Sequence, residues 1–214
     1  MFSGASTFAD AVDGAFLFIL LTSVALLVFI TFLMIYFVIK YNRKRHKKAV
    51  NIEGSVPLEI LWTVIPTILV LAMFWYGWYG YKKIRDVPED AMVVQVSGQM
   101  WQWKFTYENG LVTDTLYVPV DMPVKLNLVS LDVNHSIFIP AFRVKEDVIP
   151  NRTNFTWFQA TKVGSYDIAC AEYCGLLHSY MYTKVVVMEE EDYSQWFVTA
   201  STEMDAGEAE EIES

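Results

Sequence analysis

Twelve residues in the last third of the chain, Cys170 to Met181, carry four side chains that bind soft metal ions. They are two cysteines, which are the only cysteines in the sequence, and the side chains of His178 and Met181. Another histidine, His135, stands at the end of a candidate strand upstream. Thiolates, imidazoles and thioethers are soft or borderline ligands, and this set selects copper over magnesium or calcium. The residues therefore predict a metal site with redox chemistry.

Two other interpretations of these residues stay open. A disulfide between Cys170 and Cys174 would suit an oxidising compartment, but it closes a short loop that adds little stability and gives His178 and Met181 no role. Structural zinc would take both cysteines and two histidines in a closed tetrahedron, but zinc makes no use of a thioether. Blue-copper sites combine imidazole, thiolate and a weak thioether, so copper accounts for more of the residues than either alternative.

Two long apolar runs precede this region. Ala15 to Ile39 contains 25 residues without a charge, which as a helix would span roughly 37 Å. Ile60 to Tyr81 contains 22 uncharged residues and would span roughly 33 Å. A signal peptide is an alternative for the first run, but the run is long for a signal core and no basic residue precedes it. The sequence therefore predicts two transmembrane helices.

The loop between the two runs is basic, whereas residues 1–14 contain neither lysine nor arginine. Its positive residues are Lys40, Arg43, Lys44, Arg45, Lys47 and Lys48. Basic loops stay on the inner side of a membrane. We therefore expect this loop inside and both termini outside.

The chain becomes acidic from Asp86 onward. This part holds 7 basic and 21 acidic residues, a formal charge of −14. Such a surface suits a cationic partner and disfavours nucleic acid, although solubility alone is an alternative explanation. Residues 201–214 contribute six of the acids and few apolar residues, a composition that predicts a disordered acidic tail.

The sequence pattern of the acidic part predicts a series of β-strands. Aromatic and polar residues alternate from Trp101 to Tyr107, which is the period of a half-buried strand. Short β-rich runs with turn residues between them follow, and this spacing is typical of a β-sandwich or barrel. We expect a transmembrane hairpin at 1–85 with spans at about 15–39 and 60–81, a β domain at 86–200 and the tail at 201–214. The sequence contains no C-x-x-C-H motif and therefore no covalent c-type haem site.

The run Cys-x-Glu-x-Cys-Gly-x-x-His-x-x-Met, together with an upstream histidine and two apolar runs, resembles subunit II of cytochrome c oxidase. The resemblance covers the whole chain except the acidic tail. It implies membrane α plus all-β architecture, with a two-helix transmembrane hairpin before a cupredoxin-like Greek-key β-sandwich or barrel. It also implies a bacterial cell membrane or a mitochondrial inner membrane, with the copper domain on the periplasmic or outer face.

The family resemblance further implies two copper ions in a dinuclear copper A centre. Cys170 and Cys174 would bridge the ions, and His135 and His178 would bind one ion each. The Met181 thioether and the Glu172 backbone carbonyl would be weak ligands. The Glu172 carboxylate would bind a magnesium ion at the interface with subunit I.

Other segments resemble the family as well. Gly98 to Trp103 matches an aromatic strand in which Trp101 would receive electrons from cytochrome c, although any strand could show this alternation. Glu59 begins the second span, where it would open a proton path or serve only as an interfacial anchor. Asp132 matches an acidic docking position, and Lys145 to Arg152 matches a segment near the haem propionates.

The resemblance implies an electron-entry subunit of a haem–copper terminal oxidase. Cytochrome c, whether soluble, tethered or fused to a partner, would reduce the copper. The electron would then pass to haem in subunit I, where oxygen is reduced to water and protons are pumped. The partners would be subunit I, other oxidase subunits and membrane lipid. The alternatives are a quinol oxidase subunit, which would lack the ligands, a membrane-tethered copper carrier outside an oxidase, and a disulfide-stapled structural domain. Departures from the family pattern affect no ligand side chain; they are Gln102, Asn151, Ala171 and Tyr173.

Overall fold

The computed structural model describes residues 4–48, 50–51 and 53–213, with side chains described as far as residue 204. The chain forms two compact units. One consists of Ala11–Tyr81, and the other combines Met1–Asp10 with Lys82–Ser214. We call the second unit the β domain.

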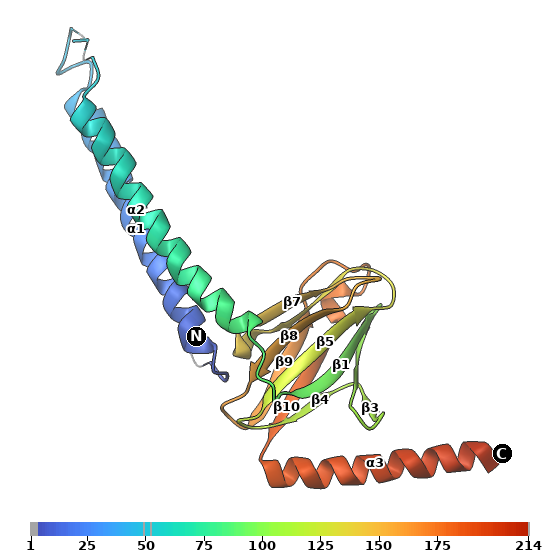
Figure 1. The fold of residues 1–214 in the computed structure, drawn as a ribbon. Helices are drawn as coiled ribbons and strands as arrows, with labels where there is room; N and C mark the ends of the chain where they lie inside the picture. The colour runs from blue at the N-terminus through green and yellow to red at the C-terminus, as the bar shows by residue number, and fades with distance from the viewer. Residues whose placement is uncertain (1–3, 49, 52, 214) are drawn as a thin grey trace. The chain divides into compact units, whose positions relative to one another are not determined.

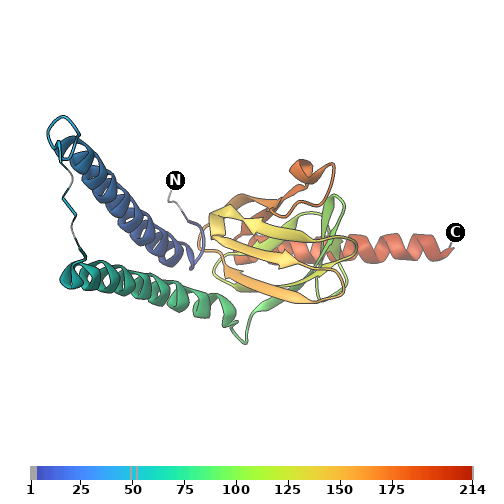
Figure 2. The same cartoon turned by 90° about the horizontal axis from the view of Figure 1, so that it is seen from above.

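The first unit is made mainly of two long helices, drawn in blue and green in Figures 1 and 2. Helix α1 spans Ala9–Lys40 and α2 spans Val56–Arg85. Both are long and apolar enough to cross a membrane, and their apolar stretches are not buried within the protein. A helix that is apolar on all sides needs an apolar surrounding, which a bilayer supplies. Helix α1 begins six residues before its uncharged run, and α2 extends four residues beyond its run at each end.

The β domain contains two five-stranded sheets (Figure 1). The first has the order β3-β2-β1-β5-β8 and the second β4-β10-β9-β6-β7. Pairing is antiparallel except for β1 with β5 and β4 with β10. The strands are β1 Met92–Gln99, β2 Gln102–Thr106, β3 Val112–Thr113, β4 Leu116–Pro119, β5 Pro123–Ser130, β6 His135–Ile139, β7 Val144–Val148, β8 Asn154–Gln159, β9 Gly164–Cys170 and β10 Tyr182–Met188. Two short 3₁₀ helices, η1 Pro140–Phe142 and η2 His178–Tyr180, lie between strands. Two apolar helices followed by a two-sheet β domain confirm the predicted fold class.

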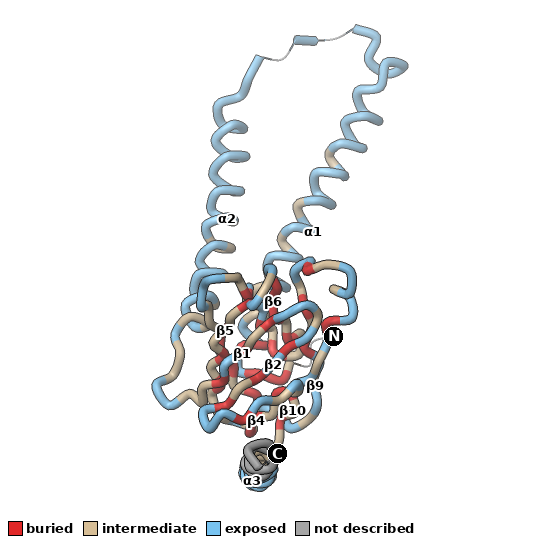
Figure 3. Tube along the Cα trace, turned by 90° about the vertical axis from the view of Figure 1, so that its right-hand side faces the viewer, coloured by how far each residue is buried: buried red, intermediate tan, exposed pale blue. Residues whose placement is uncertain are grey.

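The core of the β domain lies between the two sheets. Strand β5 alternates regularly between buried and partly exposed residues, as expected for a strand with one face on a core. Leu126 and Leu128 on β5 are fully buried, and so are Ile137 and Ile168 on the other sheet. Each such side chain contributes roughly 1.5–3 kcal/mol through burial. Figure 3 shows the buried residues in red within the β domain, whereas α1 and α2 are mostly exposed. Strands β6 and β9, which carry His135 and Cys170, contribute Ile137 and Ile168 to this core.

Residues Gly4–Ala9, which we call the N-terminal strap, belong to the β domain. The Ala5 carbonyl accepts a hydrogen bond from the Thr161 amide at 2.9 Å. The Phe8 ring packs edge-on against Trp157, with the ring centroids 4.7 Å apart. This contact was not predicted from the sequence, which placed residues 1–14 with the transmembrane hairpin. The strap instead completes a part of the β domain that is distant in sequence.

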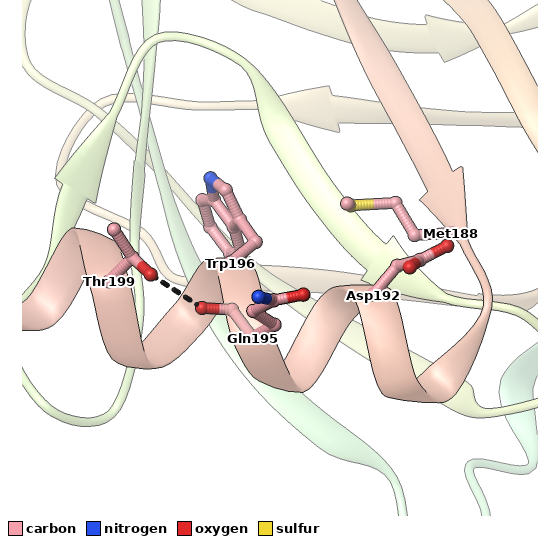
Figure 4. Close-up of a pocket in the computed structure, with 5 residues that line it drawn as sticks. All are labelled: Met188, Asp192, Gln195, Trp196 and Thr199. Atoms are coloured by element: carbon pink, nitrogen blue, oxygen red, sulfur yellow. Dashed lines mark hydrogen bonds between the residues drawn. The ribbon is translucent and has the colours of Figure 1, made fainter.

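The chain ends in helix α3, Glu190–Glu213. Trp196 stacks on Tyr117 at 4.3 Å, and Tyr193 donates a hydrogen bond to the Met92 sulfur at 3.3 Å. Beside Trp196 lies a shallow pocket (Figure 4), lined by Met188, Asp192, Gln195, Trp196 and Thr199. The helix continues through residues that the sequence analysis expected to be disordered. Glu and Ala are good helix formers, so a helix anchored at its start can extend along them.

Candidate metal centre

The expected ligands come from two neighbouring strands and the loop that follows one of them. His135 is the first residue of β6 and Cys170 is the last residue of β9. The two strands pair antiparallel, with Ile137 opposite Cys170. This pairing brings together two ligands that are 35 residues apart. The remaining ligands lie in the loop of residues 171–181 before β10; they are Cys174, His178 and Met181.

The two cysteine sulfurs lie at the middle of this cluster, with a histidine nitrogen beside each of them. The sulfurs of Cys170 and Cys174 are 3.8 Å apart. His135 Nδ1 is 3.9 Å from the first sulfur, and His178 Nδ1 is 3.5 Å from the second. The Met181 sulfur lies 3.7 Å from that of Cys174. All five side chains therefore converge, as the sequence predicted.

Both cysteines are free thiols in the structure. Their sulfurs are 3.8 Å apart, whereas a disulfide bond is about 2.0 Å long. The disulfide-stapled domain considered from the sequence is therefore not the arrangement observed. A pair of unbonded thiols at this distance leaves both sulfurs available as metal ligands.

The cluster is largely shielded from water. His135 and Met181 are fully buried, and Cys170 and Cys174 are buried as well. Burial, together with the adjacent Cys170 thiol, raises the pKa of the Cys174 thiol to about 12. A metal that binds these sulfurs as thiolates must therefore displace protons from them. Buried sulfur ligands disfavour hard cations such as magnesium or calcium.

Glu172 presents its backbone to the cluster. Its carbonyl oxygen lies 3.2 Å from the Cys170 sulfur, while the residue as a whole is exposed. The carbonyl therefore stands where a weak ligand was expected. Among the described residues, the group of His, Cys, Asp or Glu side chains able to hold a metal consists of His135, Cys170 and Cys174. The Glu172 carboxylate lies outside that group.

Trp101 contacts the loop of residues 171–181 directly. Its indole nitrogen donates a hydrogen bond to the Cys174 carbonyl at 3.2 Å. Gly175, which has a φ of +116°, lies against the indole, and a Cβ there would be 3.4 Å from Trp101 Cζ2. The indole is thus more than a packing element of the sheet, because it contacts the backbone between two ligands.

Two residues at the site were not identified as site residues from the sequence. Gly98 lies so close to the His135 ring that a Cβ there would be 3.2 Å from its Cδ2. Asp132, predicted only as a docking or surface charge, lies with Oδ1 2.7 Å from His135 Nε2. Burial alone would raise the pKa of Asp132, but hydrogen bonds from the Met100 amide, His135 and the Val133 amide together lower it. The spacing of Asp132 and His135 is visible in the sequence, but the fold of the turn between them is not.

Two further positions singled out in the sequence are Glu59 and Asn151. Glu59 is in the first turn of α2, in the helical unit. Asn151, which stands where the family more often has glycine, has a φ of 59°. Asparagine tolerates this left-handed conformation better than most residues, so the departure preserves the local backbone.

Comparisons with known proteins cover both units. The family model "Cytochrome C oxidase subunit II, periplasmic domain" matches residues 66–189, and the corresponding transmembrane-domain model matches residues 1–77. Cytochrome c oxidase subunit 2 of Synechocystis sp. is 30% identical, over 90% of this chain and 73% of the relative. The Cereibacter sphaeroides protein of the same name is also 30% identical, over 86% and 74%. The crystal structure of the periplasmic domain of subunit II of the Bradyrhizobium japonicum cytochrome oxidase superposes with a TM-score of 0.52. It is 32% identical and covers 55% of this chain and 99% of that domain.

Proposed function

Because this chain belongs to the family of cytochrome c oxidase subunit II, we propose that it accepts electrons from cytochrome c at a dinuclear copper A centre. It is an electron-transfer subunit of a haem–copper oxidase, anchored in the membrane by two helices with a periplasmic domain. In our proposal the electrons pass on to haem in subunit I, where oxygen is reduced to water and protons are pumped.

One observation carries the copper assignment: two free thiols lie 3.8 Å apart, and each has a histidine Nδ1 beside it. The Met181 sulfur and the Glu172 carbonyl add two further donors next to the thiols. Six donor atoms exceed the four of a closed zinc tetrahedron. In our proposal these donors would hold two copper ions, with Cys170 and Cys174 as ligands that both ions would share. Copper bound there would take up and release one electron at a time.

The protein's part in this reaction is to keep the ligands fixed. Strand pairing between β6 and β9 holds His135 beside Cys170. The Cys170 amide donates a hydrogen bond to the Met181 carbonyl at 3.1 Å, which joins the two ends of the ligand loop. Ligands that are already in place need little rearrangement when an electron arrives. Burial and the hydrogen bonds that the ligands make to neighbouring groups tune the reduction potential.

We assign electron entry to Trp101, whose hydrogen bond to the Cys174 carbonyl supports this role. Around the ligand loop, the surface carries exposed apolar side chains: Leu131, Tyr173, Leu176 and Tyr180 are each more than 60% exposed. A protein that docks here would bury this apolar surface. Cytochrome c as donor and subunit I as acceptor are the partners that the family membership supports.

Three finer assignments follow from the family. The Glu172 carboxylate, which is exposed, would hold magnesium at the interface with subunit I. Glu59, in the first turn of α2, would open a proton path. Because the two relatives and the solved domain described above are bacterial, we place the complex in a bacterial cell membrane, with the basic loop inside.

Isolation of the intact complex through a tag on this chain tests the oxidase assignment. We expect a large haem-bearing subunit to co-purify and the preparation to consume oxygen when reduced cytochrome c is supplied. Isolation of a copper-loaded chain without haem, after mild solubilisation that preserves other respiratory complexes, would support the membrane-tethered copper carrier instead.

A further inference from the structure

Asp132 lies between a metal ligand and the segment that leads to Trp101. Its Oδ1 is 2.7 Å from His135 Nε2 and accepts a hydrogen bond from the Val133 amide at 2.6 Å. Its Oδ2 accepts a hydrogen bond from the amide of Met100 at 2.7 Å. One carboxylate therefore contacts two parts of the site through separate oxygens.

The contact with His135 determines which imidazole nitrogen can bind a metal. When Nε2 carries the proton and donates it to Asp132, the lone pair of Nδ1 is free for a metal. Nδ1 is the nitrogen that faces the Cys170 sulfur, at 3.9 Å. His135 is fully buried, so the carboxylate and not bulk water is the partner of Nε2.

Gly98 also lies close against the His135 ring. A Cβ at Gly98 would lie 3.2 Å from His135 Cδ2 and 3.0 Å from Trp103 Cζ3. The Gly98 carbonyl also accepts a hydrogen bond from the Leu131 amide at 3.0 Å. The ring therefore has little room to turn in response to a change at Asp132, and the hydrogen bond to Nε2 determines the tautomer.

The contact with Met100 acts on the electron-entry residue. Met100 immediately precedes Trp101, and the two residues connect β1 to β2. Trp101 in turn donates a hydrogen bond to the Cys174 carbonyl. The carboxylate thus holds the start of the segment whose indole contacts the ligand loop.

We propose that Asp132 is a positioning residue that sets the tautomer of His135 with one oxygen and the place of the Met100–Trp101 segment with the other. This inference rests on the proposed function, because it concerns the same metal centre. It differs from the docking role expected from the sequence, in which Asp132 would act on cytochrome c through its charge alone. The side chain is 18% exposed, and both of its oxygens are engaged within the protein.

Two substitutions separate positioning from charge. Asp132→Glu keeps the charge but moves the carboxylate by one methylene. Asp132→Asn keeps the shape, but its single carbonyl oxygen cannot accept hydrogen bonds from both Met100 and His135. Asp167→Asn is the matched control, because it removes an exposed acid from the same domain.

The first measurement is nitrogen NMR of the metal-free full chain labelled with ¹⁵N-histidine, which contains three histidines. We expect His135 to be protonated at Nε2 in the wild type and in Asp167→Asn. In Asp132→Asn we expect a shift toward the Nδ1-protonated form. A wild-type His135 tautomer in Asp132→Asn would overturn the positioning role.

The second measurement is copper affinity against a competing chelator, together with the kinetics of cytochrome c oxidation by the oxidase complex. Loss of a partner of a ligand histidine typically weakens metal binding about 10–100-fold. We expect that loss in both Asp132 variants and a fall in kcat, with wild-type values in Asp167→Asn. If Asp132 acted through its charge alone, Asp132→Glu would have wild-type copper affinity and kinetics. Asp132→Asn would have a raised KM for cytochrome c with unchanged copper affinity. That pair of results would overturn the inference.

These outcomes are distinct from failure of the proposed function. If the wild type binds two coppers and the Asp132 variants match it, only the positioning role is wrong. If the wild type binds no copper, the proposed function is wrong, while the tautomer comparison still decides whether Asp132 orients His135.

Discussion

The indole nitrogen of Trp101 donates a hydrogen bond to the carbonyl oxygen of Cys174, with 3.2 Å between the two atoms. Cys174 is a proposed copper ligand, so the bond leads from the indole through one residue's backbone to a ligand sulfur. Gly175 makes the approach possible, because its φ of +116° is one that side chains rarely allow. The electron-entry residue and the ligand loop are therefore joined by a direct contact.

Trp101→Phe removes the hydrogen-bond donor and keeps an aromatic ring. We expect the copper content to stay unchanged while electron transfer from cytochrome c slows roughly tenfold or more, a barrier increase of about 1.4 kcal/mol. Stopped-flow reduction of the complex by cytochrome c measures the rate. Trp196→Phe, on α3, is the control and should behave as the wild type. An unchanged rate in Trp101→Phe would contradict the entry role.

Met181→Leu replaces the buried thioether with a side chain of similar volume that cannot bind metal. Because a weak ligand tunes the potential rather than holding the metal, we expect both coppers to remain and the reduction potential to shift. Redox titration of the visible absorption, with a parallel metal count, measures both. Complete loss of copper would show that Met181 is an essential ligand and would refute its weak-ligand role.

Phe8→Ala tests the N-terminal strap. Phe8 is 5% exposed and packs on Trp157, and removal of a buried aromatic ring typically costs about 3–5 kcal/mol. We expect the β domain of the full chain to unfold at lower denaturant concentration. Val112→Ala, at an exposed site, should change little. Equal stability of the two variants would mean that the strap does not contribute to the β domain.

The docking of α3 should depend on pH through Tyr193. Burial raises the pKa of Tyr193 to about 12 from its ordinary value of 10.0. The folded state therefore holds the proton more tightly than the unfolded state. The stability that neutral Tyr193 contributes is complete below pH 10.0 and is lost as the pH rises toward about 12.

Fluorescence of the tryptophans on titration to high pH should report this loss, because Trp196 lies beside Tyr193. We expect Tyr193→Phe to weaken the pH dependence. Burial also raises the pKa of Tyr107, so a change at still higher pH should remain. Tyr180→Phe, which alters an exposed tyrosine, should follow the wild-type curve. A Tyr193→Phe curve identical to the wild type would exclude Tyr193 as the responsible group.

The sequence predicted the cluster of side chains because most of it lies in one short loop, where spacing alone limits the possible chemistry. It also predicted His135, although the contact with Cys170 depends on pairing between β6 and β9 that the sequence does not reveal. The apolar runs predicted both helices because length and lack of charge determine whether a helix suits a bilayer.

Contacts between backbone segments far apart in the chain could not be predicted from the sequence. The hydrogen bond from the Met100 amide to Asp132 joins residues 32 apart, and no pattern of residue types marks it. The strap contacts Phe142 and Thr161, more than a hundred residues away. In α3, composition favoured disorder from residue 201, whereas anchoring by Tyr193 and Trp196 supports a helix that continues into the same residues.

The central claim is that two thiolates hold two copper ions that share one electron. The most direct test is a metal count combined with electron paramagnetic resonance on the purified, oxidised complex. We predict two copper ions at this site for each copy of the chain, in addition to any copper held elsewhere in the complex. We also predict a mixed-valence hyperfine pattern from an electron spread equally over two copper nuclei. Zinc at this site, a single copper with an ordinary one-nucleus pattern, or a covalent bond between Cys170 and Cys174 would contradict it.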